Sequence, residues 1–339
     1  MSYNPEPVAR VIRGETVESV HYGSIAVAEA GGQLLYCVGD PYFMTFLRSS
    51  AKPFQAVAVV ESGAAKEFGF ISSEIAIIAG SHSGEEFHVQ AVRSILDKIG
   101  LGTQNLKCGV HPPISDGSLS ETGDIRPENS PIYHNCSGKH AGMLAIAVFK
   151  SLSVDDYISP SHPVQKLIKK TISEICCYPE DKIGMAIDNC SAPNFALPLY
   201  NMALGFARLV TPNAVPREKA YAYNTVAAAM LDHPEYVAGS GRFDTLVIGS
   251  SGEKIIAKAG AEALECFSYI DRKMGVAVKI IDGSKRALFP VSVELLYKMG
   301  ARAKSMELEQ FHRPVIHNWR GLEVGRIEPG FAIREVDNE

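Results

Sequence analysis

The order of the strand and helix patterns predicts an α+β protein, in which an antiparallel sheet from early and late strands encloses a helical middle. Apolar residues alternate or cluster over 24–30 and 33–39, on either side of Gly31-Gly32, which is a two-residue hairpin signal. From Ser50 onward the apolar residues recur with the period of a helix. Strand-like segments return near the end of the chain, so we expect the sheet to pair early and late segments.

The individual elements follow from the same periodicity. Helices are predicted over residues 51–61, 73–79, 85–99, 137–152, 164–176, 197–209, 217–232 and 289–299. Strands are predicted over 182–188, which reads as buried, and over 243–248, 254–263 and 274–282. Leu101–Pro131 is rich in Gly, Pro, Asn and Ser, and irregular stretches of this length are usually functional or mobile. No repeat or composition shift marks a linker, so residues 1–339 are expected to form a single catalytic unit with a helical subregion at about 50–180.

Composition excludes several classes of protein. Hydrophobic residues make up 46% of the 339 residues and charged residues 21%, as in ordinary globular proteins. Lys and Arg number 33 against 38 Asp and Glu, for a net charge of −5, which argues against nucleic-acid and anionic-membrane partners. No apolar run approaches the 18 residues of a membrane-spanning helix. The absence of a secretory signal and the odd number of cysteines, seven, lead us to expect a cytoplasmic protein.

The strongest local signal for chemistry is Arg48-Ser49-Ser50-Ala51-Lys52-Pro53, where strand-like sequence gives way to a helix. It contains Ser49-x-x-Lys52, and residues three apart on a helix share a face. Serine is a weak nucleophile that needs a base, and lysine serves as one only when it is neutral. Its pKa must then fall several units from about 10.4, through burial or a second cation. Taken alone, the motif also fits a capped helix with an exposed lysine.

Two later segments strengthen this hypothesis. Gly80-Ser81-His82-Ser83-Gly84 is a hydroxyl-rich turn after an apolar helix, and Lys258-Ala259-Gly260 lies in a predicted late strand. Serine enzymes of the β-lactamase and penicillin-binding kind have Ser-x-x-Lys, a Ser-x-Asn turn and Lys-Thr-Gly in this order. The sequence resembles that order, although His82-Ser83 and Ala259 depart from it.

Two further segments carry candidate ligands. In His134–His140 and Asp188-Asn189-Cys190, the thiols of Cys136 and Cys190 are candidate zinc ligands, with Lys139 as an unusual third ligand if it is deprotonated, although the spacing matches no common zinc finger. A disulfide, a cysteine nucleophile and a pair of partly buried thiols remain open alternatives. Gly239–Thr245 is interpreted as a turn before a strand, in which Arg242 either holds a substrate carboxylate or pairs with Asp244 at the surface.

Together these segments resemble the L-asparaginase II family of the Rhizobium etli type (class 3). The resemblance is carried by Arg-Ser-Ser-Ala-Lys-Pro-Phe-Gln, Gly-Ser-His-Ser-Gly-Glu, His-Asn-Cys-Ser-Gly-Lys-His, Asp-Asn-Cys-Ser-Ala-Pro-Asn-Phe, Gly-Ser-Gly-Arg-Phe-Asp-Thr and Lys-Ala-Gly-Ala-Glu, which run from Arg48 to Glu262. It implies a fold related to serine β-lactamases and glutaminases, a homodimer, and hydrolysis of L-asparagine to L-aspartate and ammonia.

The resemblance also implies roles for single residues. Ser49 and Lys52 would form one Ser–Lys pair, Ser81 and Lys258 a second, with Ser49 as our choice of nucleophile. Cys136, Lys139 and Cys190 match the family's zinc positions, with zinc as an aid to substrate positioning rather than the source of the nucleophile. Arg48, His140 and Asp188 are expected to lie beside the substrate or the metal ion. Arg242 is the candidate for binding a substrate carboxylate. The alternatives are a zinc-dependent amidohydrolase built on the cysteine cluster and a non-catalytic amino-acid-binding protein.

Overall fold

A computed structural model describes residues 4–111, 130–250, 253–300 and 306–336, and it has the predicted α+β architecture. Part of the predicted irregular stretch 101–131 lies outside these residues. The strands are β1 (Glu6–Arg13), β2 (Thr16–Glu29), β3 (Leu34–Val38), β4 (Met44–Phe46), β5 (Gly184–Ile187), β6 (Pro193–Pro198), β7 (Ile255–Gly260), β8 (Leu264–Tyr269), β9 (Met274–Ile280), β10 (Val315–His317), β11 (Glu323–Pro329) and β12 (Arg334–Glu335).

The helical elements occupy most of the middle of the chain. The α-helices are α1 (Lys52–Glu61), α2 (Ala64–Glu67), α3 (Ser72–Ile78), α4 (Glu86–Lys98), α5 (Ser137–Phe149), α6 (Pro163–Ile175), α7 (Leu199–Leu209), α8 (Arg217–Asp232), α9 (Pro234–Val237), α10 (Phe243–Ser250), α11 (Lys285–Lys298) and α12 (Met306–His312). Short 3-10 turns are η1 (Arg48–Ala51), η2 (Thr103–Asn105), η3 (Pro131–Tyr133), η4 (Glu180–Lys182) and η5 (Pro212–Ala214). No helix among the described residues is long and apolar enough to cross a membrane.

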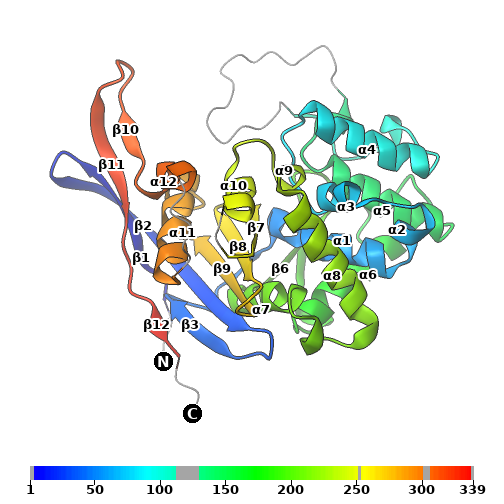
Figure 1. Ribbon diagram of the computed structural model, residues 1–339, viewed down its shortest axis with the longest axis horizontal. Helices are drawn as coiled ribbons and strands as arrows, with labels where there is room; N and C mark the ends of the chain where they lie inside the picture. Colours follow the sequence, from blue (N-terminus) through cyan, green and yellow to red (C-terminus); the bar gives the residue numbers. More distant parts are fainter. Residues whose placement is uncertain (1–3, 112–129, 251–252, 301–305, 337–339) are drawn as a thin grey trace.

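The main sheet joins the two ends of the chain, as predicted. Its order is β10-β11-β1-β2-β9-β8-β7, with β3 on β2 and β12 on β3, and every pair is antiparallel. The β2–β3 hairpin turns at Gly31-Gly32, where the Gly32 N–H donates to the Glu29 carbonyl. Figure 1 shows the β1–β2 and β10–β11 hairpins extending away from the helical part.

The centre of this sheet is covered on both faces. All seven residues of β9 are buried, and because side chains alternate between faces, neither face of β9 can be open to water. Helix α7 packs on one face so closely that a Cβ on Gly275 would lie 1.9 Å from the Ala203 carbonyl oxygen. Helix α11 also contacts β9. The strands that carry functional residues are therefore held rigidly.

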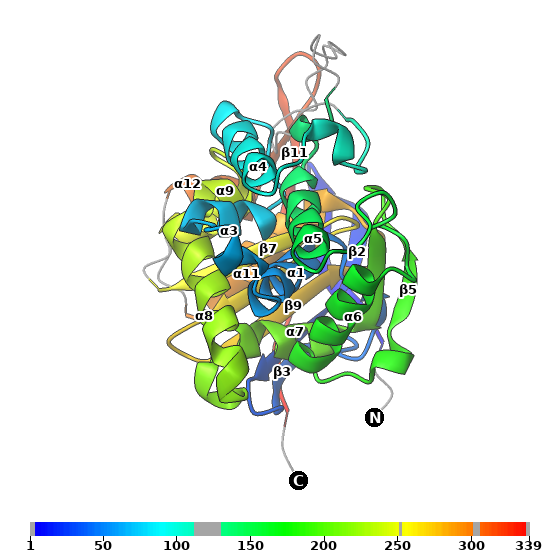
Figure 2. The same ribbon diagram turned by 90° about the vertical axis from the view of Figure 1, so that its right-hand side faces the viewer.

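Helix α1 is the core of the helical part. Its residues from Lys52 to Val60 are all buried, which fits a helix that is apolar on nearly every side. It contacts α3 and α8, and also α5 and α6, and Figure 2 shows it between these neighbours. Pro53 stands in its first turn, where the missing N–H leaves no hydrogen bond unmade.

A second, smaller sheet lies beside the start of α1. Its order is β4-β6-β5, also antiparallel, with β6 buried between two edge strands. Strand β4 ends one residue before Leu47, and β5 ends one residue before Asp188. The small sheet therefore brings the Arg48 and Asp188 segments to one place.

Three sequence predictions differ from the structure. Residues 243–248 form the helix α10 instead of a strand, because a short apolar run does not distinguish the two. The strand expected over 182–188 is present as β5, but it is exposed along its length because it lies at a sheet edge. The strand expected over 254–263 ends at Gly260, and the β8 strand that follows was not predicted. The predicted helices are confirmed, and each observed helix end lies within four residues of the predicted one.

Candidate active site

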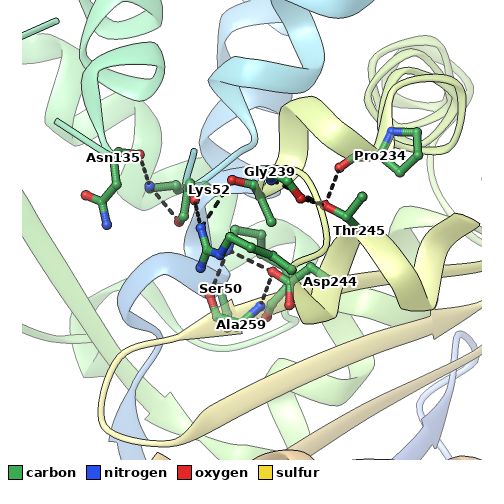
Figure 3. A network of polar contacts seen from close by, with 12 residues as sticks. Ser50, Lys52, Asn135, Pro234, Gly239, Asp244, Thr245 and Ala259 are labelled. Atoms are coloured by element: carbon green, nitrogen blue, oxygen red, sulfur yellow. Dashed lines mark hydrogen bonds and ion pairs between the residues drawn. The ribbon is translucent and has the colours of Figure 1, made fainter. Parts of the chain in front are cut away.

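The candidate site lies where η1 and α1 meet β7 and the loops after α3 and α9 (Figure 3). The Ser50 hydroxyl donates to the Lys258 carbonyl at 2.8 Å. A Cβ on Gly260 would lie 2.9 Å from the Leu47 carbonyl oxygen, so glycine permits this approach of β7 to η1. The Ser-x-x-Lys segment and the Lys-Ala-Gly segment, more than 200 residues apart, are thereby brought together.

Lys52 is the buried base candidate. Its side chain is 1% exposed, and its Nζ lies 2.7 Å from Ser81 Oγ and 3.0 Å from the Asn135 carbonyl oxygen. Burial, together with the positive charges of Lys139 and Lys258, lowers the pKa of Lys52 to about 8, although Cys136 and Cys190 act in the opposite direction. The amine is therefore partly neutral near neutral pH, as a general base must be.

The hydrogen-bond pattern differs from the expected pairing of Ser49 with Lys52 and Ser81 with Lys258. Among the described residues, the side chain of Lys52 bonds to Ser81, and the Ser49 hydroxyl has no hydrogen bond. The long Lys52 side chain extends from the start of α1 to the loop after α3. Ser49 is half-buried and Ser81 is buried, so Ser49 is the more exposed residue of the two.

Lys258 is held by groups other than Ser81. Its Nζ donates to the Ala259 carbonyl at 2.7 Å and lies 3.4 Å from Asp244 Oδ2. The same Asp244 oxygen accepts the Ala259 N–H at 2.9 Å, as Figure 3 shows. Both partners of this ion pair are buried. Lys258 thus stands as a fixed cation beside Lys52.

The Arg242 side chain binds backbone carbonyl groups and not the Asp244 carboxylate. It is 9% exposed, and its Nη1 donates to the Ser81 carbonyl at 2.6 Å and to the Ala238 carbonyl at 3.2 Å. The interpretation of Arg242 and Asp244 as a surface pair is therefore wrong, because both residues are buried and bind elsewhere. In this arrangement Arg242 fixes the position of Ser81.

A clamp between the segments 80–85 and 236–242 completes the positioning of Ser81. The Ser81 N–H donates to the Val237 carbonyl at 2.7 Å. The Glu85 carboxylate accepts the N–H of Ser240 at 2.9 Å and its hydroxyl at 2.7 Å. Gly239 has a φ of +144° and a Cβ there would lie 2.3 Å from Ser83 Oγ, so only glycine fits.

Arg48 and Asp188 form the other wall of the site. Arg48 Nε donates to Asp188 Oδ1 at 2.8 Å, and its Nη2 donates to Asn189 Oδ1 at 3.2 Å. Burial raises the pKa of Asp188, but the cations Lys139 and Arg48 outweigh this and lower it overall. Arg48 has a φ of 50°, a left-handed conformation that is uncommon for a residue with a side chain and often occurs at functional sites.

The cysteine cluster is assembled by helix α5 and the Asp188–Cys190 turn. Cys136 and Cys190 are buried, and Lys139 Nζ lies 2.8 Å from Cys190 Sγ. A hydrogen bond with Cys136 and the charge of Lys139 lower the pKa of Cys190 to about 5, although burial opposes them. Gly138 allows this arrangement, since a Cβ there would lie 2.4 Å from the Ile77 carbonyl oxygen of α3.

His140 is placed one residue beyond Lys139 on α5 and is fully buried. Its Nδ1 lies 2.7 Å from the Tyr157 hydroxyl. Burial and then the Lys139 charge lower the pKa of His140 to about 3. The imidazole is therefore neutral throughout the working pH range.

The sequence predictions missed two residues of the site. Asp244 was interpreted as part of a surface turn, but an acidic residue in the first turn of a helix, after Gly-Ser-Gly, is a helix-start signal that would have placed it. Glu85 was assigned only to the start of a helix, and no local pattern indicates that its carboxylate reaches Ser240, 155 residues away.

The family model described as L-asparaginase II matches residues 9–329. Solved structures similar to this chain include Mglu in its L-glutamate binding form, with a TM-score of 0.39, 11% identity, and coverage of 84% of this chain and 60% of that one. Another is a β-lactamase (Mb2281c) from Mycobacterium bovis, with a TM-score of 0.39, 13% identity, and coverage of 81% and 94%. This chain spans about 60% of the length of Mglu. A search of curated proteins finds no match.

The described residues form an α+β fold with a buried lysine, Lys52, hydrogen-bonded to a serine, Ser81. Because the family model matches nearly the whole chain, the chain belongs to the L-asparaginase II family.

Proposed function

We propose that this protein hydrolyses L-asparagine to L-aspartate and ammonia by Ser–Lys nucleophilic catalysis. The observation that carries the proposal is the buried Lys52 amine, whose pKa is lowered to about 8 and which lies 2.7 Å from Ser81 Oγ. A neutral lysine amine can activate a serine by taking its hydroxyl proton, and the buried Lys52 amine is suited to that role.

Lys52 is the general base and Ser49 the nucleophile. A neutral amine has two N–H groups and one lone pair, and Ser81 Oγ and the Asn135 carbonyl supply an acceptor for each N–H. The lone pair then remains for the hydroxyl of the more accessible Ser49. The first step forms the bond from Ser49 Oγ to the side-chain amide carbon and moves the hydroxyl proton to Lys52.

The second half of the reaction reverses this proton transfer. The protonated Lys52, assisted by Ser81, returns its proton to the departing nitrogen, and the C–N bond breaks to release ammonia. Water then hydrolyses the acyl-enzyme with Lys52 again as base. Lys258, fixed by Asp244, is a constant positive charge that favours the neutral form of Lys52.

Arg48, Asp188 and His140 are the proposed substrate-binding groups. The Arg48 guanidinium and the Asp188 carboxylate suit the charged ends of an amino acid. Arg242 acts in this proposal through Ser81, whose carbonyl it holds.

A zinc ion fits the cysteine cluster. Among the described residues, no group of three or more His, Cys, Asp or Glu side chains is arranged to hold a metal, and the third ligand that we propose is the Lys139 amine. Two buried cysteines and the adjacent Lys139 nitrogen give such a set. Burial would lower the pKa of Lys139, but Cys190 and Cys136 raise it, so in the absence of an ion the amine is protonated and must lose a proton to bind zinc.

Cys136, Lys139 and Cys190 would therefore hold the ion. When bound, zinc would supply Lewis-acid polarisation to a substrate group and help to position it. The nucleophile and the base come from Ser49 and Lys52, so zinc is not the source of the nucleophile. All cysteines are free thiols, and we place the enzyme in the reducing environment of the cytoplasm.

The proposed active form is a homodimer. Strand β5, at the edge of the small sheet, is exposed along its length and presents the apolar side chains of Met185 and Ile187 on one face. Exposed apolar side chains of this kind often belong to a protein interface. Light scattering after size exclusion tests this proposal with Ile187→Lys, which should yield monomers. The matched variant Ile71→Lys, at an exposed isoleucine before α3, should leave the mass unchanged.

Ammonia release from L-asparagine, and separately from L-glutamine, is the direct test of function. We expect rapid release from L-asparagine and less from L-glutamine, since one methylene group contributes only about 1–3 kcal/mol of discrimination. Ser49→Ala should abolish release in a folded protein, whereas a Ser81→Ala variant should still form an acyl-enzyme on Ser49. An acyl group found on Ser81 of the wild-type protein would show that Ser81 is the nucleophile and Ser49 the assisting serine. Loss of all activity to a chelator would favour a zinc hydrolase.

A further inference from the structure

One nitrogen of His140 has no partner in a part of the molecule that is otherwise well bonded. Nε2 is buried and makes no hydrogen bond with any described residue. Buried polar atoms in folded proteins nearly always have a partner. The charged groups that act on this ring are Lys139, Cys136, Lys52 and Asp188, so it belongs to the candidate site. The unpaired nitrogen therefore indicates a place for a ligand atom.

The hydrogen bonds of Tyr157 determine which atom of His140 carries the proton. Tyr157 is fully buried, and its hydroxyl oxygen accepts the Lys107 N–H at 2.9 Å. Its single O–H must then find an acceptor, and the described contacts of Tyr157 offer His140 Nδ1 at 2.7 Å. If Nδ1 carried the proton instead, the Tyr157 O–H would be left without an acceptor. The satisfied arrangement places the imidazole proton on Nε2.

Tyr157 is itself fixed in position. Its carbonyl accepts the side-chain amide of Gln165 at 2.8 Å, and the Gln165 side chain is also buried. His140 lies on α5, whose close packing against α3 through Gly138 and Gly142 prevents the ring from moving away. Two rigid segments thus determine the direction in which Nε2 points.

We propose that Tyr157 is a positioning residue that fixes His140 in the Nε2–H tautomer, and that this N–H donates to a carboxylate oxygen of the amino-acid ligand. The proposal rests on the proposed function, since it names the ligand group that this part of the site binds. A protonated Nε2 has no lone pair for a metal ion, so the group it selects is a hydrogen-bond acceptor. The carboxylates of the substrate and of the product L-aspartate are the strongest acceptors available.

The tautomer is measured by long-range ¹H–¹⁵N correlation spectra of the histidine rings, with His140→Gln to assign the His140 signals. We expect the wild-type protein to show the Nε2–H form of His140, and L-aspartate to shift the Nε2 signal. A wild-type ring protonated on Nδ1 would overturn the proposal. A ring in the Nε2–H form that L-aspartate does not affect would also overturn it, because water would then be the partner.

Tyr157→Phe removes the O–H while keeping the ring. We expect a mixture of His140 tautomers and a KM for L-asparagine about tenfold higher, with kcat changed less than threefold. Tyr269→Phe is the matched control, because its buried hydroxyl has no hydrogen-bond partner among the described residues and lies at the end of β8. A Tyr157→Phe variant with a lower melting temperature but the wild-type tautomer and KM would show a purely structural role and overturn the proposal.

These measurements separate the inference from the proposed function. If the wild-type protein released no ammonia, the proposed function would fail. The tautomer of His140 and its response to L-aspartate would still be measured directly in the same sample.

Discussion

Lys52 and Ser81 are joined by a 2.7 Å hydrogen bond between two segments that lie 29 residues apart. The bond lies in a fully buried part of the molecule, where it is shielded from water. It connects the start of the central helix α1 to the loop after α3. In the proposed mechanism, this contact lets Lys52 exchange a proton with Ser81 as well as with Ser49.

The pH dependence of activity follows from the Lys52 amine. Since its pKa is lowered to about 8, the neutral, active form increases as the pH rises through that value. We expect kcat/KM to rise about tenfold per pH unit below pH 8 and to level off above it. Lys52→Arg should abolish turnover because arginine stays protonated. A flat profile between pH 6 and 9 would show that another group is the base.

The ion pair between Asp244 and Lys258 gives the second prediction. Asp244→Asn keeps an acceptor for the Ala259 N–H but removes the charge that faces Lys258. We expect kcat to fall about tenfold to a hundredfold, since breaking a buried charge pair typically costs several kcal/mol and disturbs its surroundings. Steady-state kinetics check this result. Asp155→Asn, at an exposed aspartate, is the control and should leave kcat unchanged.

Local sequence patterns correctly predicted the helices, one hairpin turn and several residues of the candidate site. The 3.6-residue period identified the helices of the middle, and Gly31-Gly32 identified the β2–β3 turn. The motifs also named residues that the fold does bring together, such as Lys52 and Ser81. The same patterns did not predict α10, because an eight-residue apolar segment is compatible with either kind of element.

Contacts between segments that lie far apart in the chain could not be predicted from the sequence. The bond of Glu85 to Ser240 spans 155 residues, and that of Arg242 to Ser81 spans 161. Neither has a local signature, because each depends on how the loop after α9 packs on the loop after α3. For the same reason the expected serine–lysine pairing differed from the observed hydrogen bonds.

Substitutions of two neighbouring glycines test the clamp that positions Ser81. Gly239→Ala should strongly lower both the melting temperature and kcat, because its Cβ would lie 2.3 Å from Ser83 Oγ. Gly241→Ala is the matched variant, since Gly241 also has a positive φ, of +70°, but nothing lies within 4 Å of a Cβ there. It should lose only about 1 kcal/mol through backbone strain. Thermal unfolding and kinetics of the two variants measure the difference, and equal effects would contradict the clamp.

The metal content of single cysteine variants tests the zinc proposal. Cys136→Ser and Cys190→Ser should each reduce bound zinc from about one equivalent to near zero, because a serine hydroxyl does not replace a thiolate ligand at neutral pH. Cys108→Ser is the control: this cysteine is buried too, but burial raises its pKa to about 12, so it stays a neutral thiol. Elemental analysis of protein purified with zinc supplied gives the stoichiometry. Zinc content equal to the parent in Cys190→Ser would reject the site, and loss of zinc in Cys108→Ser would point to general misfolding instead.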